Sequence, residues 1–189
     1  MRALIAAVLF CAMASAQAAE VAGVRIDEAA RVAGTELKLN GAGLRSRAFF
    51  KVYAMGLYLQ DKQTAPAVIL AAPGPKRVHI RMLRDVNAND FSGALNDGLK
   101  DNHTEAEMQG LAPRIALLAG IMNEMKEAKT GLSIDIDWIP VAGTQVMIGG
   151  QARGKPIAGE DFYRALLRVW LGDNPVQGDL RKALLGQGG

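Results

Sequence analysis

The sequence predicts an α+β fold in which an antiparallel sheet is covered by helices on one face. Three observations support this prediction. Extended, strand-like patterns fill residues 24–59, helical spacing of apolar residues dominates residues 87–127, and strand patterns return at 132–157 before a last helical stretch. Strands that come in two groups, with helices after each group, are typical of α+β domains.

The N-terminus is typical of a secretory signal peptide. Arg2 supplies a positive charge, residues 4–13 form an apolar run, and residues 16–18 match a small-residue cleavage pattern. We therefore expect residues 1–18 to be removed during export, which places the mature protein in a bacterial periplasm.

Two other interpretations of this segment are disfavoured. The apolar run is shorter than the roughly 20 residues that a membrane-spanning helix needs. Cys11 follows the bulky Phe10, whereas a lipid-accepting cysteine normally follows a small residue. We expect cleavage near Ala18, no stable membrane anchor, and a single domain over residues 19–189.

Composition limits the classes of function. About 170 residues remain after cleavage, enough for one domain that buries roughly 70% of its unfolded surface. The full chain is 50% apolar and 5% aromatic, and its net charge of +3 comes from scattered basic residues. A nucleic-acid partner is therefore not expected. With no cysteine left after cleavage, stability must come from core burial.

The first half of the domain has the patterns of strands. Charged and apolar residues alternate over 36–40, and residues 49–59 are apolar apart from Lys51, which predicts a strand buried on both faces. A short helix is expected at 65–70, followed by a half-exposed strand at 78–82.

The next element is an amphipathic helix. Asn87 can cap it, with Asp90 three residues on, and its apolar row is Phe91, Leu95 and Leu99. This row must face a sheet or another helix.

A longer helix is expected over residues 105–127. Thr104 and Glu107 form a capping box at its start, and Pro113 is expected to kink or restart it. Its core-facing stripe consists of Leu111, Ile115, Leu118, Met122 and Met125.

Strict alternation over residues 132–138 predicts a strand. Asp135 and Asp137 share one face of it. Paired carboxylates could serve acid or metal chemistry, but the alternation favours the solvent side of an amphipathic strand.

The last third of the chain predicts a hairpin and two helices. Gly149 and Gly150 suit a tight turn between strands at 144–148 and 152–157. A helix at 161–171 and a short one at 178–185 follow. The apolar face of the first comprises Phe162, Leu166, Val169 and Trp170.

Familiar catalytic and cofactor motifs are incomplete. Gly149, Gly154 and Lys155 have P-loop spacing, but Pro156 stands where the magnesium-binding Ser or Thr belongs. The two histidines lie in different elements without metal-ligand spacing, and no serine has a nucleophile elbow. We expect no catalytic residue, no metal and no cofactor.

Arg45 and Arg47 adjoin a strand whose residues are apolar apart from Lys51 and Tyr53. One interpretation is an arginine at the sheet edge paired with a surface acid. The other is a guanidinium fork that receives a ligand carboxylate or phenolate.

Four segments, in order, resemble the chalcone isomerase-like family. A glycine-rich turn with an arginine at 41–45 precedes an aromatic-rich strand at 49–59 that ends in a Gly-x-Tyr-Leu pattern. Residues 81–86 and 159–173 are similar to the bacterial branch of that family. The resemblance implies an open-faced β-sandwich, with a ligand cleft between one large sheet and its covering helices.

The resemblance also implies loss of the chalcone isomerase reaction. Tyr53 falls where the plant enzymes have Thr, Phe91 where they have Tyr, Gly98 near an Asn and Val169 near a Thr. Removing one positioned hydrogen-bond donor typically costs about 2.7–4 kcal/mol of transition-state stabilisation.

Non-catalytic relatives bind fatty acids through an Arg and a Tyr, and Arg45 and Tyr53 reproduce that pair, with Arg47 as the rival. The resemblance therefore favours a binder of a small apolar carboxylate or phenolic ligand. An isomerase or lyase acting on an enone, and a purely structural domain, are the alternatives. The candidate ligand walls are Phe91, Leu95, Phe162, Leu166 and Val169.

Overall fold

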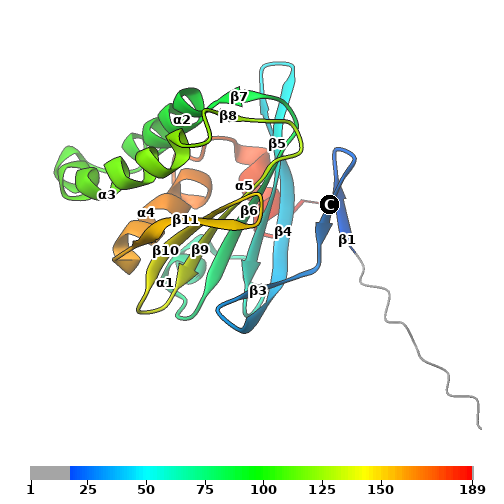
Figure 1. The fold of residues 1–189 in the computed structure, drawn as a ribbon. Helices are drawn as coiled ribbons and strands as arrows, with labels where there is room; N and C mark the ends of the chain where they lie inside the picture. The colour runs from blue at the N-terminus through cyan, green and yellow to red at the C-terminus, as the bar shows by residue number, and fades with distance from the viewer. Residues whose placement is uncertain (1–17, 189) are drawn as a thin grey trace, which may run out of the picture.

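The computed structural model describes residues 18–188, so the expected signal peptide lies outside the described residues apart from Ala18. Figure 1 shows the chain as one curved sheet with helices on one side. The strands are β1 (Ala18–Val21), β2 (Val24–Asp27), β3 (Ala29–Val32), β4 (Thr35–Arg47), β5 (Phe50–Leu59), β6 (Lys76–Met82), β7 (Val86–Asn87), β8 (Glu127–Ala128), β9 (Ser133–Ile139), β10 (Gly143–Ile148) and β11 (Gln151–Ile157). The helices are α1 (Pro66–Ala71), α2 (Ala88–Lys100), α3 (Glu105–Asn123), α4 (Glu160–Leu171) and α5 (Gly178–Leu184).

Seven strands form the main sheet in the order β11-β10-β9-β6-β5-β4-β3, and every neighbouring pair is antiparallel. Helices α2, α3 and α4 lie on one side, and the β1–β2 hairpin lies on the other (Figure 1). The predicted α+β architecture, an antiparallel sheet covered on one face, is therefore confirmed.

The main core lies between the sheet and the helices. Alternate residues of each strand face it, because successive side chains of a strand point to opposite faces. Met55 and Leu57 of β5, Ile80 of β6, and Phe162 and Leu166 of α4 belong to this one cluster. A smaller cluster on the opposite face joins Ile26 of β2 to Leu39 and Tyr58.

Helix α5 packs directly on β4, which depends on two glycines. A Cβ atom at Gly41 would lie 2.1 Å from the Ala183 carbonyl oxygen, and one at Gly43 would lie 2.7 Å from the Ala183 Cβ. Register shifts interrupt the β4–β5 pairing between Leu39 and Gly41 and again after Arg45. The glycines thus bring the C-terminal segment against the strand that carries Arg45.

Several local predictions are confirmed. Thr104 and Glu107 form the capping box of α3, and the Asn87 side chain caps α2 by accepting from the Asn89 backbone N–H. Gly149 and Gly150 both have positive φ, of 59° and 78°, in the turn between β10 and β11.

Two predictions about element ends are wrong. Helix α3 continues through Pro113, so it does not restart there, and it ends at Asn123 and not at 127. Residues 127–128 instead pair as β8 with β7. The strand expected at 49–59 begins at Phe50, and its start is not buried, since Phe49 is 100% and Phe50 59% exposed. Apolar character alone does not establish that a partner covers a residue.

Candidate functional site

Arg45 and Tyr53 lie directly opposite each other on β4 and β5. Both are on the sheet face that the helices cover, since Tyr53 belongs to the main core cluster. The structure therefore brings together the two residues that the sequence analysis selected as a head-group site. Arg45 is half-buried and Tyr53 is buried.

The Tyr53 hydroxyl is held by a side chain from α4. The Trp170 indole N–H donates to the Tyr53 oxygen at 3.0 Å. Burial raises the pKa of the Tyr53 phenol above its ordinary value, against the opposing effects of Trp170 and of the Arg45 charge. The phenol therefore stays protonated at neutral pH, and its proton has no acceptor among the described side chains and carbonyls.

Gln177, which precedes α5, holds the Arg45 end of the site. Its side-chain oxygen accepts from the Ser46 backbone N–H at 2.8 Å and from Arg45 Nη1 at 3.3 Å. Its amide donates to the Leu44 carbonyl at 3.1 Å. Arg45 Nη1 also donates to the Ser46 carbonyl.

Arg45 has no acidic partner in the described part of the chain. Both of its hydrogen bonds to Ser46 and Gln177 come from Nη1. The guanidinium also interacts with the Tyr53 hydroxyl, and its remaining N–H groups have no acceptor among the described residues. The interpretation of Arg45 as an edge arginine paired with a surface acid does not fit this geometry. A half-buried cation and a buried phenol proton instead point to one region that can receive an anionic oxygen.

The five candidate walls lie in the same core cluster as Tyr53. Phe91 meets Tyr53 edge-on, with ring centres 6.4 Å apart and planes inclined by 63°. Phe162, Leu166 and Val169 on α4 are completely enclosed, whereas Phe91 and Leu95 on α2 keep a little exposure. These two α2 residues therefore form the side of the core that is nearer to solvent.

Leu95 also lines a groove between α2 and α3 with a volume of about 410 Å³. The other apolar residues that line it are Leu99, Met108, Ala112, Ile115, Ala116, Leu118, Ala119 and Met122. Helices α2 and α4 pack closely and leave no groove at Gly98, because a Cβ at Gly98 would lie 2.7 Å from Val169 Cγ1. The groove shares Leu95 with the candidate walls, whereas Arg45, Tyr53 and Phe91 do not line it.

Arg47 does not share this environment. It is exposed at the end of β4 and pairs in register with Phe50, beyond the irregularity that follows Arg45. The structure thus separates the two rival arginines, and Arg45 is the one beside Tyr53.

Sequence reasoning missed Trp170 and Gln177 as site residues. Trp170 carried a usable signal, because a tryptophan on the apolar face of a helix needs a partner for its N–H once buried. Gln177 carried none, because its role depends on the contact between the C-terminal segment and β4.

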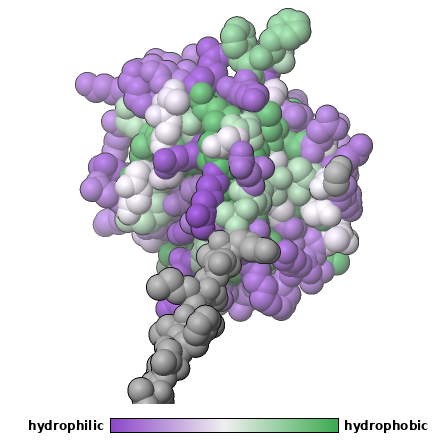
Figure 2. All heavy atoms as spheres, turned by 90° about the vertical axis from the view of Figure 1, so that its right-hand side faces the viewer, coloured by the Kyte–Doolittle hydropathy of each residue, from purple (hydrophilic) through white to green (hydrophobic). Residues whose placement is uncertain are grey.

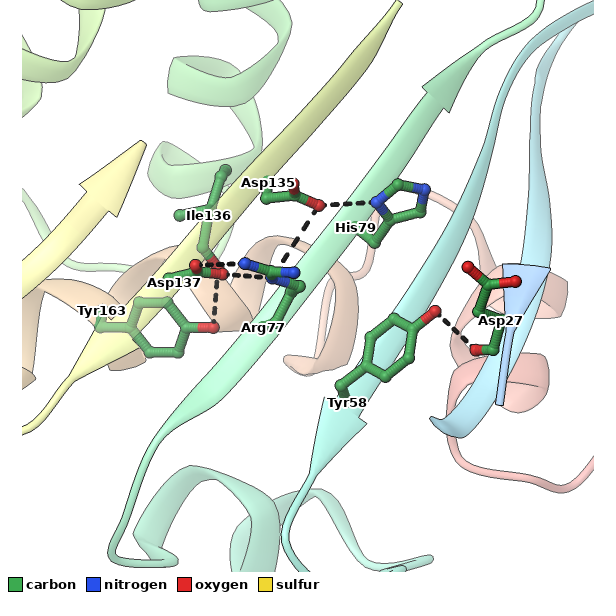
Figure 3. Close-up of polar contacts among 8 residues, drawn as sticks. All are labelled: Asp27, Tyr58, Arg77, His79, Asp135, Ile136, Asp137 and Tyr163. Carbon is green, nitrogen blue, oxygen red and sulfur yellow. Dashed lines mark hydrogen bonds and ion pairs between the residues drawn. The ribbon is translucent and has the colours of Figure 1, made fainter. Parts of the chain in front are cut away.

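A second polar cluster lies on the opposite face of the sheet (Figure 3). Arg77 on β6 binds both carboxylate oxygens of Asp137, through Nε and Nη2, each at 2.6 Å. His79 Nδ1 lies 2.6 Å from the carboxylate of Asp135, which is also 3.9 Å from Arg77 Nε.

The prediction that Asp135 and Asp137 face solvent is wrong. They are only 8% and 4% exposed. The two residues do share a face, but the neighbouring strand supplies a cation and an imidazole opposite them, so the carboxylates are paired and buried. The hydrogen bond to Asp137 raises the pKa of Arg77, which keeps the guanidinium charged. Arg77 and His79 therefore occupy both carboxylates.

The described residues contain no group of three or more metal-ligating side chains placed to hold an ion. Within residues 18–188, no helix is both long and apolar enough to cross a membrane.

Comparison with known proteins identifies the family of the sequence and a solved structure with a similar fold. The sequence pattern of the chalcone isomerase-like family matches residues 18–186. The crystal structure of a fatty-acid binding protein from Arabidopsis thaliana superposes with a TM-score of 0.66 at 16% sequence identity, covering 86% of this chain and 92% of that one. No curated protein matches the sequence significantly.

Proposed function

Because the chain belongs to the chalcone isomerase-like family, we propose that it is a non-catalytic binding protein for a small apolar carboxylate such as a fatty acid. The proposed head-group site is Arg45 with Tyr53, between the sheet and the helices. The similar Arabidopsis thaliana structure is itself that of a fatty-acid binding protein.

One observation carries the proposal. The Tyr53 hydroxyl accepts from Trp170 and stays protonated, so its own proton is available to an acceptor that the described residues do not supply. Arg45 sits directly opposite, with guanidinium N–H groups to spare. A carboxylate can accept two parallel hydrogen bonds from a guanidinium and one from a phenol, and a buried setting strengthens each of them.

The tail of the ligand needs an apolar path away from this head group. Phe91 touches Tyr53, and Leu95, one turn further along α2, lines the groove against α3. The α4 walls Phe162, Leu166 and Val169 belong to the same core cluster as these residues. We propose that the tail displaces Phe91 and Leu95 slightly and lies in the groove, which has the size and apolar lining typical of small-molecule sites.

The test compares a fatty acid with its methyl ester. Native mass spectrometry of the purified protein should show a bound apolar acid, and calorimetric titration should show a clear preference for the acid. The ester keeps the tail but cannot accept charge-assisted hydrogen bonds, so the difference isolates the head group. Equal affinities for acid and ester would refute an Arg45–Tyr53 head-group site.

We further propose that the protein works in the periplasm after cleavage near Ala18, on the basis of the N-terminal sequence. Intact mass of the exported protein is the measurement. A mature product that begins near residue 19 is expected, and a product that keeps residue 1 or carries lipid on Cys11 would contradict export with cleavage.

A further inference from the structure

The turn between β4 and β5 presents two adjacent phenylalanines to solvent. Phe49 is 100% and Phe50 59% exposed, and neither belongs to a core cluster. Figure 2 shows a hydrophobic protrusion at the top of the molecule, where Figure 1 places the tip of this hairpin. The two rings are not needed for folding, because polar residues in this turn would leave the core unchanged. An exposed aromatic pair at a tip indicates a contact with something outside the chain.

Cations surround this tip. Residues 44–53 contain Arg45, Arg47 and Lys51 and no acid. The Arg84 guanidinium lies 4.6 Å from the centre of the Phe50 ring. Across residues 18–188, no acidic side chain pairs with Arg47, Lys51 or Arg84.

The acid that follows Arg84 in the chain is already occupied. Asp85 accepts from the Thr130 backbone N–H at 2.7 Å and pairs with Lys129 at 3.0 Å. These bonds lower the pKa of Asp85 to about 2. Its carboxylate is therefore charged at neutral pH but paired with Thr130 and Lys129, and not with Arg84. The tip therefore combines apolar rings with unneutralised positive charge.

We infer that the β4–β5 tip is a docking site for an anionic lipid membrane. Phe49 and Phe50 enter the boundary between headgroups and acyl chains, and Arg47, Lys51 and Arg84 meet lipid phosphates. Aromatic rings with basic flanks are the composition that binds such a surface, through apolar burial and attraction to anionic headgroups. The long basic side chains can lay their stems along the rings while their charges stay at the phosphates.

A narrow, convex tip fits a lipid surface better than a folded protein partner. A stable protein interface buries roughly 800 Å² on each side, far more than two neighbouring side chains supply. A fluid bilayer closes around a small protrusion without a matching pocket.

If the protein binds a fatty acid as proposed above, docking at this tip would also favour exchange of that ligand with the membrane. Tyr53 lies three residues from Phe50 on the same strand, roughly 10 Å away at the rise of a β-strand. A docked hairpin would bring the head-group site close to the bilayer in which apolar carboxylates dissolve. Docking itself is measured without any added ligand, so its failure is distinguishable from failure of fatty-acid binding.

The first experiment is vesicle sedimentation with the exported protein and three variants of it. Vesicles are phosphatidylcholine alone or phosphatidylcholine mixed with phosphatidylglycerol. The wild type should bind the anionic vesicles more tightly, and added salt should weaken binding because it screens the charges. Phe49→Ser/Phe50→Ser should lower the affinity about ten- to hundredfold. Arg47→Gln/Lys51→Gln should remove most of the preference for anionic vesicles.

Val141→Ser is the matched control. Val141 is also fully exposed, but it lies in the β9–β10 turn at the other end of the sheet. This variant should bind vesicles like the wild type, and all variants share the same N-terminus. Equal vesicle binding by Phe49→Ser/Phe50→Ser and Val141→Ser would overturn the inference. The inference would also be overturned if the wild type bound neither kind of vesicle and instead self-associated through the two rings, as measured by sedimentation equilibrium.

A second measurement reports insertion directly. The native tryptophans, Trp138 and Trp170, are buried, so their emission should change little when vesicles are added. In Phe49→Trp, the new indole should shift its emission to shorter wavelength with anionic vesicles. An indole at this position that stays water-like in the presence of bound vesicles would exclude insertion of the tip.

Discussion

The Trp170 indole N–H donates to the Tyr53 hydroxyl at 3.0 Å and so joins α4 to β5 inside the core. Removing the hydroxyl with Tyr53→Phe leaves a buried indole N–H without an acceptor, which should cost about 1–3 kcal/mol of unfolding free energy. In a Trp170→Phe background, the same Tyr53→Phe change should cost much less, because no donor is orphaned. Urea unfolding of the wild type, both single variants and the double variant measures this coupling.

Tyr163→Phe serves as the control for that cycle. Tyr163 is also a buried tyrosine, but its hydroxyl donates to the Ile136 carbonyl at 3.2 Å, and it lies two helical turns from Trp170. Its effect should add to that of Trp170→Phe. Additive effects for Tyr53 and Trp170 as well would mean that their contact contributes nothing.

Arg45 and Arg47 should differ in ligand binding. Arg45→Ala should weaken fatty-acid binding by about 1.5–3 kcal/mol, because a charged hydrogen-bond donor to the carboxylate is lost. Arg47→Ala should do much less, since Arg47 is exposed beyond the site. Calorimetry with acid and methyl ester is the measurement, with circular dichroism to verify folding. A folded Arg45→Ala protein that still prefers the acid would remove Arg45 from the site.

The Arg77–Asp137 pair should matter for stability and not for ligand binding. Asp137→Ala leaves a largely buried guanidinium without its partner and should cost about 3–5 kcal/mol. Arg77→Met/Asp137→Leu removes both charges and should cost far less. Lys38→Ala breaks an exposed pair with Asp61 and should cost no more than about 1 kcal/mol. Thermal and urea unfolding measure all three, and a double variant as unstable as Asp137→Ala would contradict the charge explanation.

Chalcone isomerisation should not exceed the uncatalysed rate. Phe91 has no hydroxyl to offer a substrate, and Val169 packs against Gly98, where a Cβ would meet it at 2.7 Å. Two positions that are polar in the enzymes are therefore filled by apolar contacts. Loss of chalcone absorbance measures turnover, and an acceleration of about a thousandfold or more would show that other residues replace the missing groups.

The sequence by itself determined the local elements, because their signals are local. Alternation over 132–138 predicted β9, glycines with positive φ predicted the turn between β10 and β11, and the Thr104–Glu107 box predicted the start of α3. Cations beside an apolar strand drew attention to Arg45 and Arg47, because a buried cation needs a partner. The pair of Arg45 with Tyr53 came from the resemblance to fatty-acid-binding relatives.

Only the tertiary structure decided what each residue meets. Periodicity predicts which side chains share a face but not what covers that face. Asp135 and Asp137 are therefore buried against Arg77 and His79, while the apolar Phe49 and Phe50 are exposed. Trp170 and Gln177 reach the site from segments more than a hundred residues away along the chain. Such contacts depend on how α4 and α5 pack on the curved sheet, which local sequence periodicity does not predict.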